Sequence, residues 1–152
     1  MTASSTATIR PLAPSDRAAW EGLWAGYLAF YESSVAPEVT EATWTRLLDP
    51  DAPMFALVAE DQAGVFGLVQ CVLHASTWSM APYCYLGDLY VDPSRRGTGA
   101  GRALIEAVYA EADARGAARV YWMTHETNAT ARLLYDRVAK ASGFIQYRRT
   151  TA

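Results

Sequence analysis

A strand, a glycine-rich loop and a helix follow one another between Tyr85 and Ala112, and this stretch constrains the fold most. Its strand is rich in β-branched and aromatic residues, and Asp92-Pro93 ends it because proline cannot donate to a ladder. Glycines then stand at positions 97, 99 and 101. Beyond them, apolar residues recur at helical spacing, so a helix is predicted over about Gly99–Arg115. The order indicates an α/β domain.

The glycine-rich loop has the features of an anion site. Glycine lets the backbone expose its N–H groups, and the first amides of a helix are unpaired and carry its positive dipole end. Neither the phosphate loop of nucleotide hydrolases nor the dinucleotide fingerprint fits, because both require a different glycine spacing. We therefore expect a diphosphate cradle made of Arg96, Gly97, Thr98, Gly99, Ala100, Gly101 and Arg102.

The spacing Arg96-x-x-Gly99-x-Gly101, preceded by the strand LYV, resembles motif A of the Gcn5-related N-acetyltransferases. In that family the loop holds the pyrophosphate of acetyl-coenzyme A. The resemblance implies that acetyl-CoA is the cofactor and that strand residues Leu89, Tyr90 and Val91 lie beside it. Within the family, YLGDLYVDP and LLYDRVA look most like the branch of yeast histone and polyamine acetyltransferases.

A second motif lies near the C-terminus. The spacing Asn128-x-x-Ala131-x-x-Leu134-Tyr135 is similar to motif B of the same family. Asn128 is predicted to cap the last helix, on which Ala131 and Tyr135 share a face one turn apart. The resemblance implies that Ala131 leaves room for the pantetheine arm and that Tyr135 is the general acid for the leaving thiolate.

Two further roles follow from the chemistry of amide formation. A backbone N–H at Leu89 is expected to stabilise the oxyanion. The acceptor amine must lose a proton, and Asp88 is the first choice of base, with Glu32, Glu126 or a water chain as alternatives. The polyamine branch often has glutamate where this chain has Gly87, so the family's usual base is absent.

The first 90 residues suggest the acceptor. They carry three basic and ten acidic side chains, whereas residues 91–152 carry ten basic and six acidic ones. An acidic half suits a cationic amine, and the overall charge of −3 argues against a nucleic-acid partner. The aromatic end of the first helix is predicted to contact the amine, and the expected acceptor-side residues are Tyr27, Phe30, Tyr31, Glu32, Asp88 and Glu126.

A small cationic amine, either a polyamine or an amino acid, is therefore the expected substrate. The alternatives are a protein or histone lysine, and a module that binds acetyl-CoA without turnover. A homodimer is expected, because the apolar C-terminal segment Phe144–Arg149 could leave a sheet edge that needs cover.

The remaining expectations come from length and composition. A chain of 152 residues with 51% apolar side chains fits one domain, residues 1–152. No segment is long and apolar enough to span a membrane, and the first residues do not resemble a secretory signal. Cys71 and Cys84 lack metal-ligand spacing, so we expect reduced core thiols, no metal and a cytoplasmic location.

The resemblance implies a mixed sheet of about six to seven strands with about four helices. An antiparallel meander is expected to include strands Met54–Glu60, Val65–Ser76 and Tyr85–Val91, with a loop over Trp78–Pro82. Strand Arg119–Thr124 follows a crossover helix, so it should lie parallel to Tyr85–Val91. These two strands are expected to splay after Val91 around the cofactor. The second helix is predicted to begin at Thr40.

Overall fold

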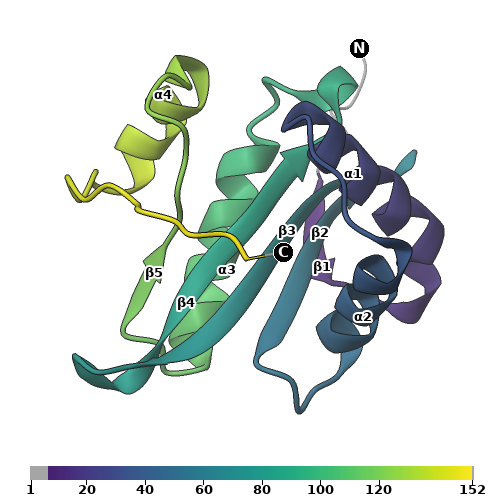
Figure 1. Ribbon diagram of the computed structural model, residues 1–152. Coiled ribbons are helices and arrows are strands. Elements are labelled where there is room, and N and C mark those ends of the chain that lie inside the picture. Colours follow the sequence, from purple (N-terminus) through teal and green to yellow (C-terminus); the bar gives the residue numbers. More distant parts are fainter. Residues whose placement is uncertain (1–6, 152) are drawn as a thin grey trace.

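The computed structural model describes residues 7–151, and Figure 1 shows their arrangement. Short 3-10 turns precede the first and third helices. The main elements, in chain order, are β1 Thr8–Pro11, α1 Arg17–Phe30, α2 Pro37–Leu48, β2 Met54–Asp61, β3 Gly64–Ser76, β4 Ser79–Val91, α3 Ala100–Ala114, β5 Arg119–Tyr121 and α4 Ala129–Val138.

The strands form one mixed sheet in the order β1-β2-β3-β4-β5. Neighbours from β1 to β4 run antiparallel, and β5 lies parallel to β4 after the crossover through α3. The meander and the parallel pair are therefore confirmed. The described residues contain five strands, so the expected count of six to seven was too high.

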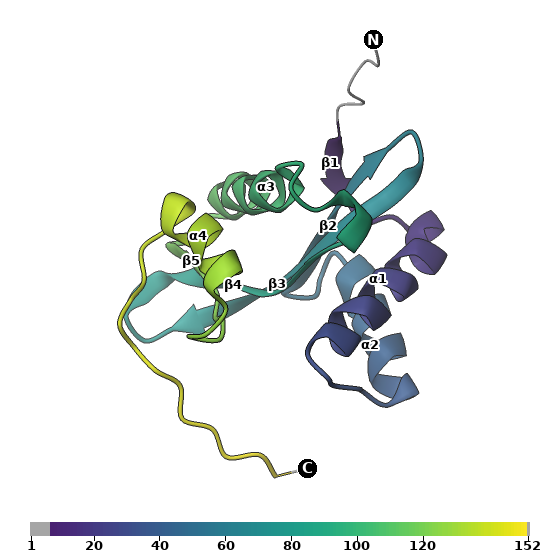
Figure 2. The same ribbon diagram turned by 90° about the horizontal axis from the view of Figure 1, so that it is seen from above.

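The helices cover both faces of the sheet. Helix α3 lies on one face, and α1 and α2 lie on the other (Figures 1 and 2). The α3 side holds a core that includes Leu104, Ile105 and Val108, none of which is exposed. The α1 side holds a second core around Trp20. Helix α1 approaches β4 closely because Gly26 has no side chain: a Cβ there would lie 2.7 Å from the Tyr90 hydroxyl oxygen.

Three predicted boundaries were wrong. Helix α2 begins one turn before Thr40, at Pro37, because proline suits the first helical position, where no N–H partner is needed. Most of the expected loop at Trp78–Pro82 is strand instead, since only Thr77 and Trp78 form the turn between β3 and β4, and Ser79 already pairs with Ser76. Strand β5 ends at Tyr121 rather than Thr124.

The C-terminal segment also differs from the prediction. Phe144–Arg149 is not a strand, although the segment is rich in apolar and aromatic residues. Phe144, Ile145 and Tyr147 have 77–91% of their surface exposed. The segment crosses in front of β4 in Figure 1, on the face covered by α1 and α2. A strand needs a partner, and β5, at the sheet edge, is only three residues long.

The parallel pair separates earlier than expected. Strand β5 pairs with β4 only from Tyr83↔Arg119 to Tyr85↔Tyr121, so the gap opens after Tyr85 rather than after Val91. A bulge lies just beyond this point: Gln70 pairs with Asp88 and Cys71 with Leu86, which leaves Gly87 without a partner. A bulge bends a strand and strengthens its twist, so Gly87 helps to turn the end of β4 away from β5.

Among the described residues no helix is long and apolar enough to cross a membrane.

Candidate active site

The glycine-rich loop turns directly into α3. Gly97 and Gly99 have φ of +80° and +85°, a region that residues with a Cβ avoid, and Gly99 is the N-cap of α3. A Cβ at either position would meet nothing within 4 Å, so their backbone is open to a ligand. Ala100 is buried beneath the loop, and the Thr98 hydroxyl donates to the Arg95 carbonyl oxygen at 2.7 Å. The loop therefore fits a diphosphate.

The three arginines of the loop have different surroundings. Arg95 forms an ion pair with Asp61 at the β2–β3 turn and lies over the Phe66 ring, so it anchors the loop. Arg102 pairs with Glu106 on the exposed side of α3. Arg96 has no carboxylate partner among residues 7–151 and is exposed.

Arg96 is also held in position. Its guanidinium lies 5.7 Å from the Phe30 ring centroid and 5.4 Å from that of Tyr90, and its Nε donates to the Val91 carbonyl oxygen at 3.2 Å. Aromatic rings attract a cation without neutralising its charge. Arg96 is thus the loop cation best prepared for a phosphate.

Asp88 lies at the bulge, on the α1 side of β4. Its Oδ2 accepts a hydrogen bond of 2.9 Å from Gln70 Nε2. The Tyr27 hydroxyl donates to the neighbouring Gly87 carbonyl oxygen at 3.3 Å. Burial raises the pKa of Asp88, while the hydrogen bond from Gln70 and the nearby Tyr27 hydroxyl act in the opposite direction. A half-buried carboxylate with a raised pKa is a suitable proton acceptor.

The backbone of β4 offers donors on its other edge. The Asp92 N–H donates to the Phe66 carbonyl oxygen of β3 at 2.9 Å. Every second residue of a strand directs its N–H toward the same neighbour, so the N–H groups of Leu89 and Val91 point away from β3. They face the edge where β5 has already ended. An N–H in such a gap is free to bind a carbonyl oxygen of a ligand.

Helix α4 positions the residues of the second motif. The Asn128 side chain caps the helix as predicted: its Oδ1 accepts from the Ala131 N–H at 3.4 Å. Tyr135 is half-buried, and its ring packs edge-on against Trp122 with centroids 5.4 Å apart. Burial raises the pKa of the Tyr135 hydroxyl, so it stays protonated at neutral pH. Leu134 packs against α3 beside Gly101, where a Cβ would lie 3.6 Å from it.

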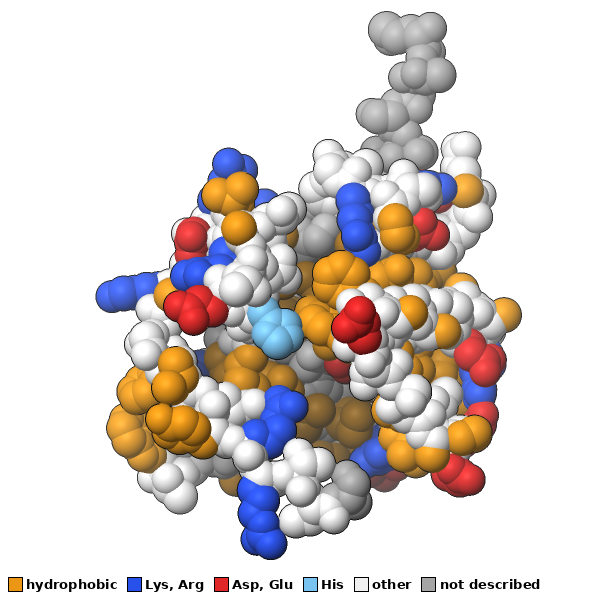
Figure 3. All heavy atoms as spheres, turned by 45° about the horizontal axis from the view of Figure 1, so that its top comes forward, with side chains coloured by type: hydrophobic (Ala, Val, Ile, Leu, Met, Phe, Trp, Pro, Cys, Tyr) orange, Lys and Arg blue, Asp and Glu red, His pale blue; other side chains and the backbone are white. Residues whose placement is uncertain are grey.

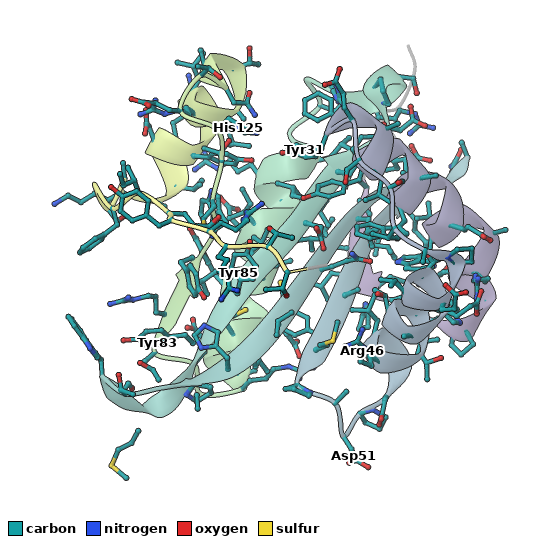
Figure 4. All side chains as sticks on the ribbon, in the orientation of Figure 1. Tyr31, Arg46, Asp51, Tyr83, Tyr85 and His125 are labelled. Carbon is teal, nitrogen blue, oxygen red and sulfur yellow. The ribbon has the colours of Figure 1, made fainter. Side chains whose placement is uncertain are left out.

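A cavity of about 260 Å³ lies between the end of α1 and the start of α4. Figure 4 shows Tyr31 and His125 on opposite sides of this cavity. Figure 3 shows the surface hollowed between the side of the molecule that carries α1 and the side that carries α4. The ring centroids of Tyr31 and His125 are 6.4 Å apart. The cavity is lined by Phe30, Tyr31, Glu32, His125, Thr127 and Asn128.

The structure thus brings some predicted residues together and separates others. Phe30, Tyr31 and Glu32 share the cavity with Asn128, whereas Tyr27 and Asp88 lie on the α1 side of β4. Glu126 does not line the cavity. His125 does, and the sequence interpretation missed it because the motif begins three residues later. Gln70, a polar residue within an apolar strand, was a second missed signal.

The acidic excess of the first 90 residues is partly used within the fold. Asp16 and Glu60 both bind Arg10, and Glu21 and Glu41 both approach Arg17. These pairs serve structure, whereas Glu32 lines the cavity and Asp88 lies on the α1 side of β4. No cluster of three His, Cys, Asp or Glu side chains suited to a metal ion occurs in residues 7–151.

Solved structures with the same architecture include aminoglycoside acetyltransferases. An aminoglycoside N-acetyltransferase, AAC(6')-Iy, in complex with CoA superposes with a TM-score of 0.85 at 17% identity, covering 100% of this chain and 99% of that one. A ribosomal-protein-alanine N-acetyltransferase from Brucella melitensis gives 0.76 at 22% identity, covering 96% and 100%. At these identities the likeness establishes the fold.

Sequence comparison establishes the family. The model of the acetyltransferase (GNAT) family matches residues 17–139. The D-amino-acid N-acetyltransferase HPA3 of Saccharomyces cerevisiae is 35% identical over 143 residues, which cover 93% of this chain and 89% of the relative. The N-acetyltransferase YhfO of Bacillus subtilis is 31% identical over 141 residues, covering 91% and 94%. The chain therefore belongs to the GNAT acetyltransferase family and is an acyltransferase that uses acetyl-CoA.

Proposed function

We propose that the chain acetylates the primary amine of a small cationic molecule, an amino acid or a polyamine. The observation that carries the proposal is the position of Asp88, a half-buried carboxylate on the α1 side of the β4 bulge, close to Tyr27 and Tyr85. A carboxylate between aromatic rings attracts an alkylammonium group and then accepts its proton. The name of the 35% identical yeast relative supports the amino-acid arm of the proposal.

Residues of the loop and α4 would hold the cofactor. Backbone amides of residues 97–101 and the Arg96 guanidinium would bind the diphosphate, and Arg102 would contribute at the rim. Leu89, Tyr90 and Val91 would lie beside the cofactor on β4, and Asn128 and Ala131 would border it from α4. Bound acetyl-CoA supplies an activated acetyl group as a thioester.

The chain's own groups account for the proton transfers. Asp88 takes the proton from the ammonium group, because only the neutral amine has a free electron pair. The Leu89 N–H stabilises the negative charge that develops on the carbonyl oxygen. Tyr135 donates its hydroxyl proton to the departing sulfur, a role that suits a phenol kept protonated by burial.

An acceptor panel tests this proposal. We expect a higher kcat/KM for spermidine or for basic amino acids than for a neutral amine of equal length, and a loss of this preference at high salt. A histone-tail peptide and D- and L-isomers of the amino acids complete the panel. Equal turnover of the neutral amine with no salt effect would show that the acidic groups do not select the acceptor.

We also propose that the chain forms a homodimer. The support is the C-terminal segment, whose residues Phe144, Ile145 and Tyr147 are exposed, next to a sheet that ends at the short strand β5. A second copy could cover both features. Light scattering at tens of micromolar should give twice the mass of one chain, and truncation after Gly143 should reduce it to one chain. A monomer mass for the full chain would refute the dimer.

A cytoplasmic location is the last part of the proposal. Cys71 and Cys84 are both buried and free, which suits a reducing compartment. Fractionation of cells that express the chain tests this directly, and recovery in a secreted fraction would contradict it.

A further inference from the structure

Gln70 is an unusual residue in its position. It belongs to β3 and faces α1, and only 4% of its surface is exposed. Its neighbours on this face include the apolar side chains Leu68 and Trp20. Burying an amide costs free energy unless both its oxygen and its nitrogen find partners. Here each of them does.

The two hydrogen bonds of Gln70 have a fixed direction. Trp20 Nε1 donates to Gln70 Oε1 at 2.7 Å, and Gln70 Nε2 donates to Asp88 Oδ2 at 2.9 Å. An indole nitrogen can only donate, so the amide oxygen must face Trp20. The amide nitrogen must then face Asp88. Trp20 is fully buried, so the start of this chain of hydrogen bonds is rigid.

We propose that Gln70 and Trp20 are positioning residues that hold Asp88 for the acceptor amine. They occupy Oδ2 with a donor, which sets the orientation of the carboxyl group and leaves Oδ1 for the substrate ammonium. The inference rests on the proposed role of Asp88 as the base, and the experiment below separates the two.

The surroundings of Asp88 indicate which way its ionisation should respond. The titratable groups that act on it or that it acts on are Tyr27 on α1, Tyr85 on β4 and Cys71 on β3, and each is neutral at pH 7. The cationic Arg148 of the C-terminal segment lies near Tyr85 and acts on the pKa of that phenol. No Arg, Lys or His among residues 7–151 forms an ion pair with it. Donors to the ionised carboxylate therefore oppose the effect of burial, and the loss of Gln70 should raise the pKa of Asp88.

The test uses three single variants and the pH profile of kcat/KM for the best amine of the panel. Gln70→Leu removes the donor to Asp88, and Trp20→Phe removes the donor that orients the amide. Trp24→Phe is the matched control, because Trp24 is a buried tryptophan one turn along α1 whose Nε1 has no hydrogen-bond partner in residues 7–151. All profiles share the ionisation of the substrate, so differences between them report on the enzyme.

The acidic midpoint is the pH at which kcat/KM falls to half its maximum on the acid side of the profile. We expect it to rise by about one pH unit in Gln70→Leu, which lowers kcat/KM at the acid end about tenfold. Trp20→Phe should shift it in the same direction by less, and Trp24→Phe should leave it unchanged. Trp20→Phe carries the test if Gln70→Leu does not fold. Unshifted midpoints in both variants, or an equal shift in Trp24→Phe, would overturn the positioning role.

An Asp88→Asn variant distinguishes failure of the base from failure of its positioning. Loss of the acidic limb that lies below the ionisation of the amine itself shows in this variant that Asp88 is the titrating group. If the limb persists, the proposed base is wrong, whatever the other variants do. If the limb disappears in Asp88→Asn but does not move in Gln70→Leu and Trp20→Phe, the base is right and only the positioning inference fails.

Discussion

Replacing Gly99 by aspartate should weaken cofactor binding by charge rather than by shape. Gly99 has φ of +85° at the start of α3, and a Cβ there meets nothing within 4 Å. Asparagine and aspartate have the same size and both tolerate this backbone region better than most residues. Gly99→Asn is therefore a control that differs from Gly99→Asp only by one negative charge.

The magnitude follows from Coulomb's law. A carboxylate about 5 Å from one phosphate charge is repelled by about 1 kcal/mol in water and by about 3 kcal/mol at the effective dielectric constant of a protein surface. Acetyl-CoA should therefore bind about 5- to 150-fold more weakly to Gly99→Asp than to Gly99→Asn. The difference should shrink at high salt, because position 99 is exposed.

Calorimetric titration with acetyl-CoA at two salt concentrations measures both effects, and thermal unfolding without ligand checks that the two variants fold alike. Equal affinity of Gly99→Asp and Gly99→Asn would mean that this loop does not face the diphosphate.

Three further predictions concern the acid, the packing of α1 and the pH dependence of stability. Tyr135→Phe should lower kcat about 100-fold with little change in acetyl-CoA affinity, which steady-state kinetics and calorimetry measure. A kcat that changes by less than twofold would mean that Tyr135 only packs. Gly26→Ala should lower the free energy of unfolding by about 1–3 kcal/mol, because its Cβ would overlap Tyr90. Gly22→Ala on the same helix should raise the free energy of unfolding by up to about 1 kcal/mol, because a Cβ there meets nothing. Urea unfolding measures both values, and equal effects would contradict the close packing at Gly26. Asp16 is buried and its arginine partner lowers its pKa, so its contribution is present above the unfolded-state pKa of about 3.9 and is lost as pH falls through the lower folded value. Asp16→Asn should therefore cost about 2 kcal/mol at pH 7 and progressively less in acid, and a pH-independent cost would show that the ion pair is not the source.

The sequence predicted the parts of the fold that depend on local chemistry. Glycine spacing and a capping asparagine fix the backbone within a few residues, so the turn into α3 and the start of α4 were confirmed at Gly99 and Asn128. The alternation of strands with one long helix likewise predicted the parallel placement of β5 beside β4.

Other features depend on contacts between distant segments, which local patterns do not reveal. The apolar and aromatic residues of Phe144–Arg149 are typical of a strand, but a strand needs a neighbour, and the edge strand β5 is only three residues long. The hydrogen bonds from Trp20 to Asp88 join α1, β3 and β4 across 50 and 18 residues of sequence. Their only local sign was the polar residue Gln70 within an apolar strand.

The central claim is that this chain transfers an acetyl group to an amine, and a product balance tests it most directly. The purified chain is incubated with acetyl-CoA and the preferred amine, and free thiol and N-acetylated amine are both quantified, the second by mass spectrometry. The account predicts equal amounts of the two products, little thiol without the amine, and a large loss of both in Asp88→Asn. Binding of acetyl-CoA without an N-acetylated product from any amine of the panel would contradict it and leave a cofactor-binding module.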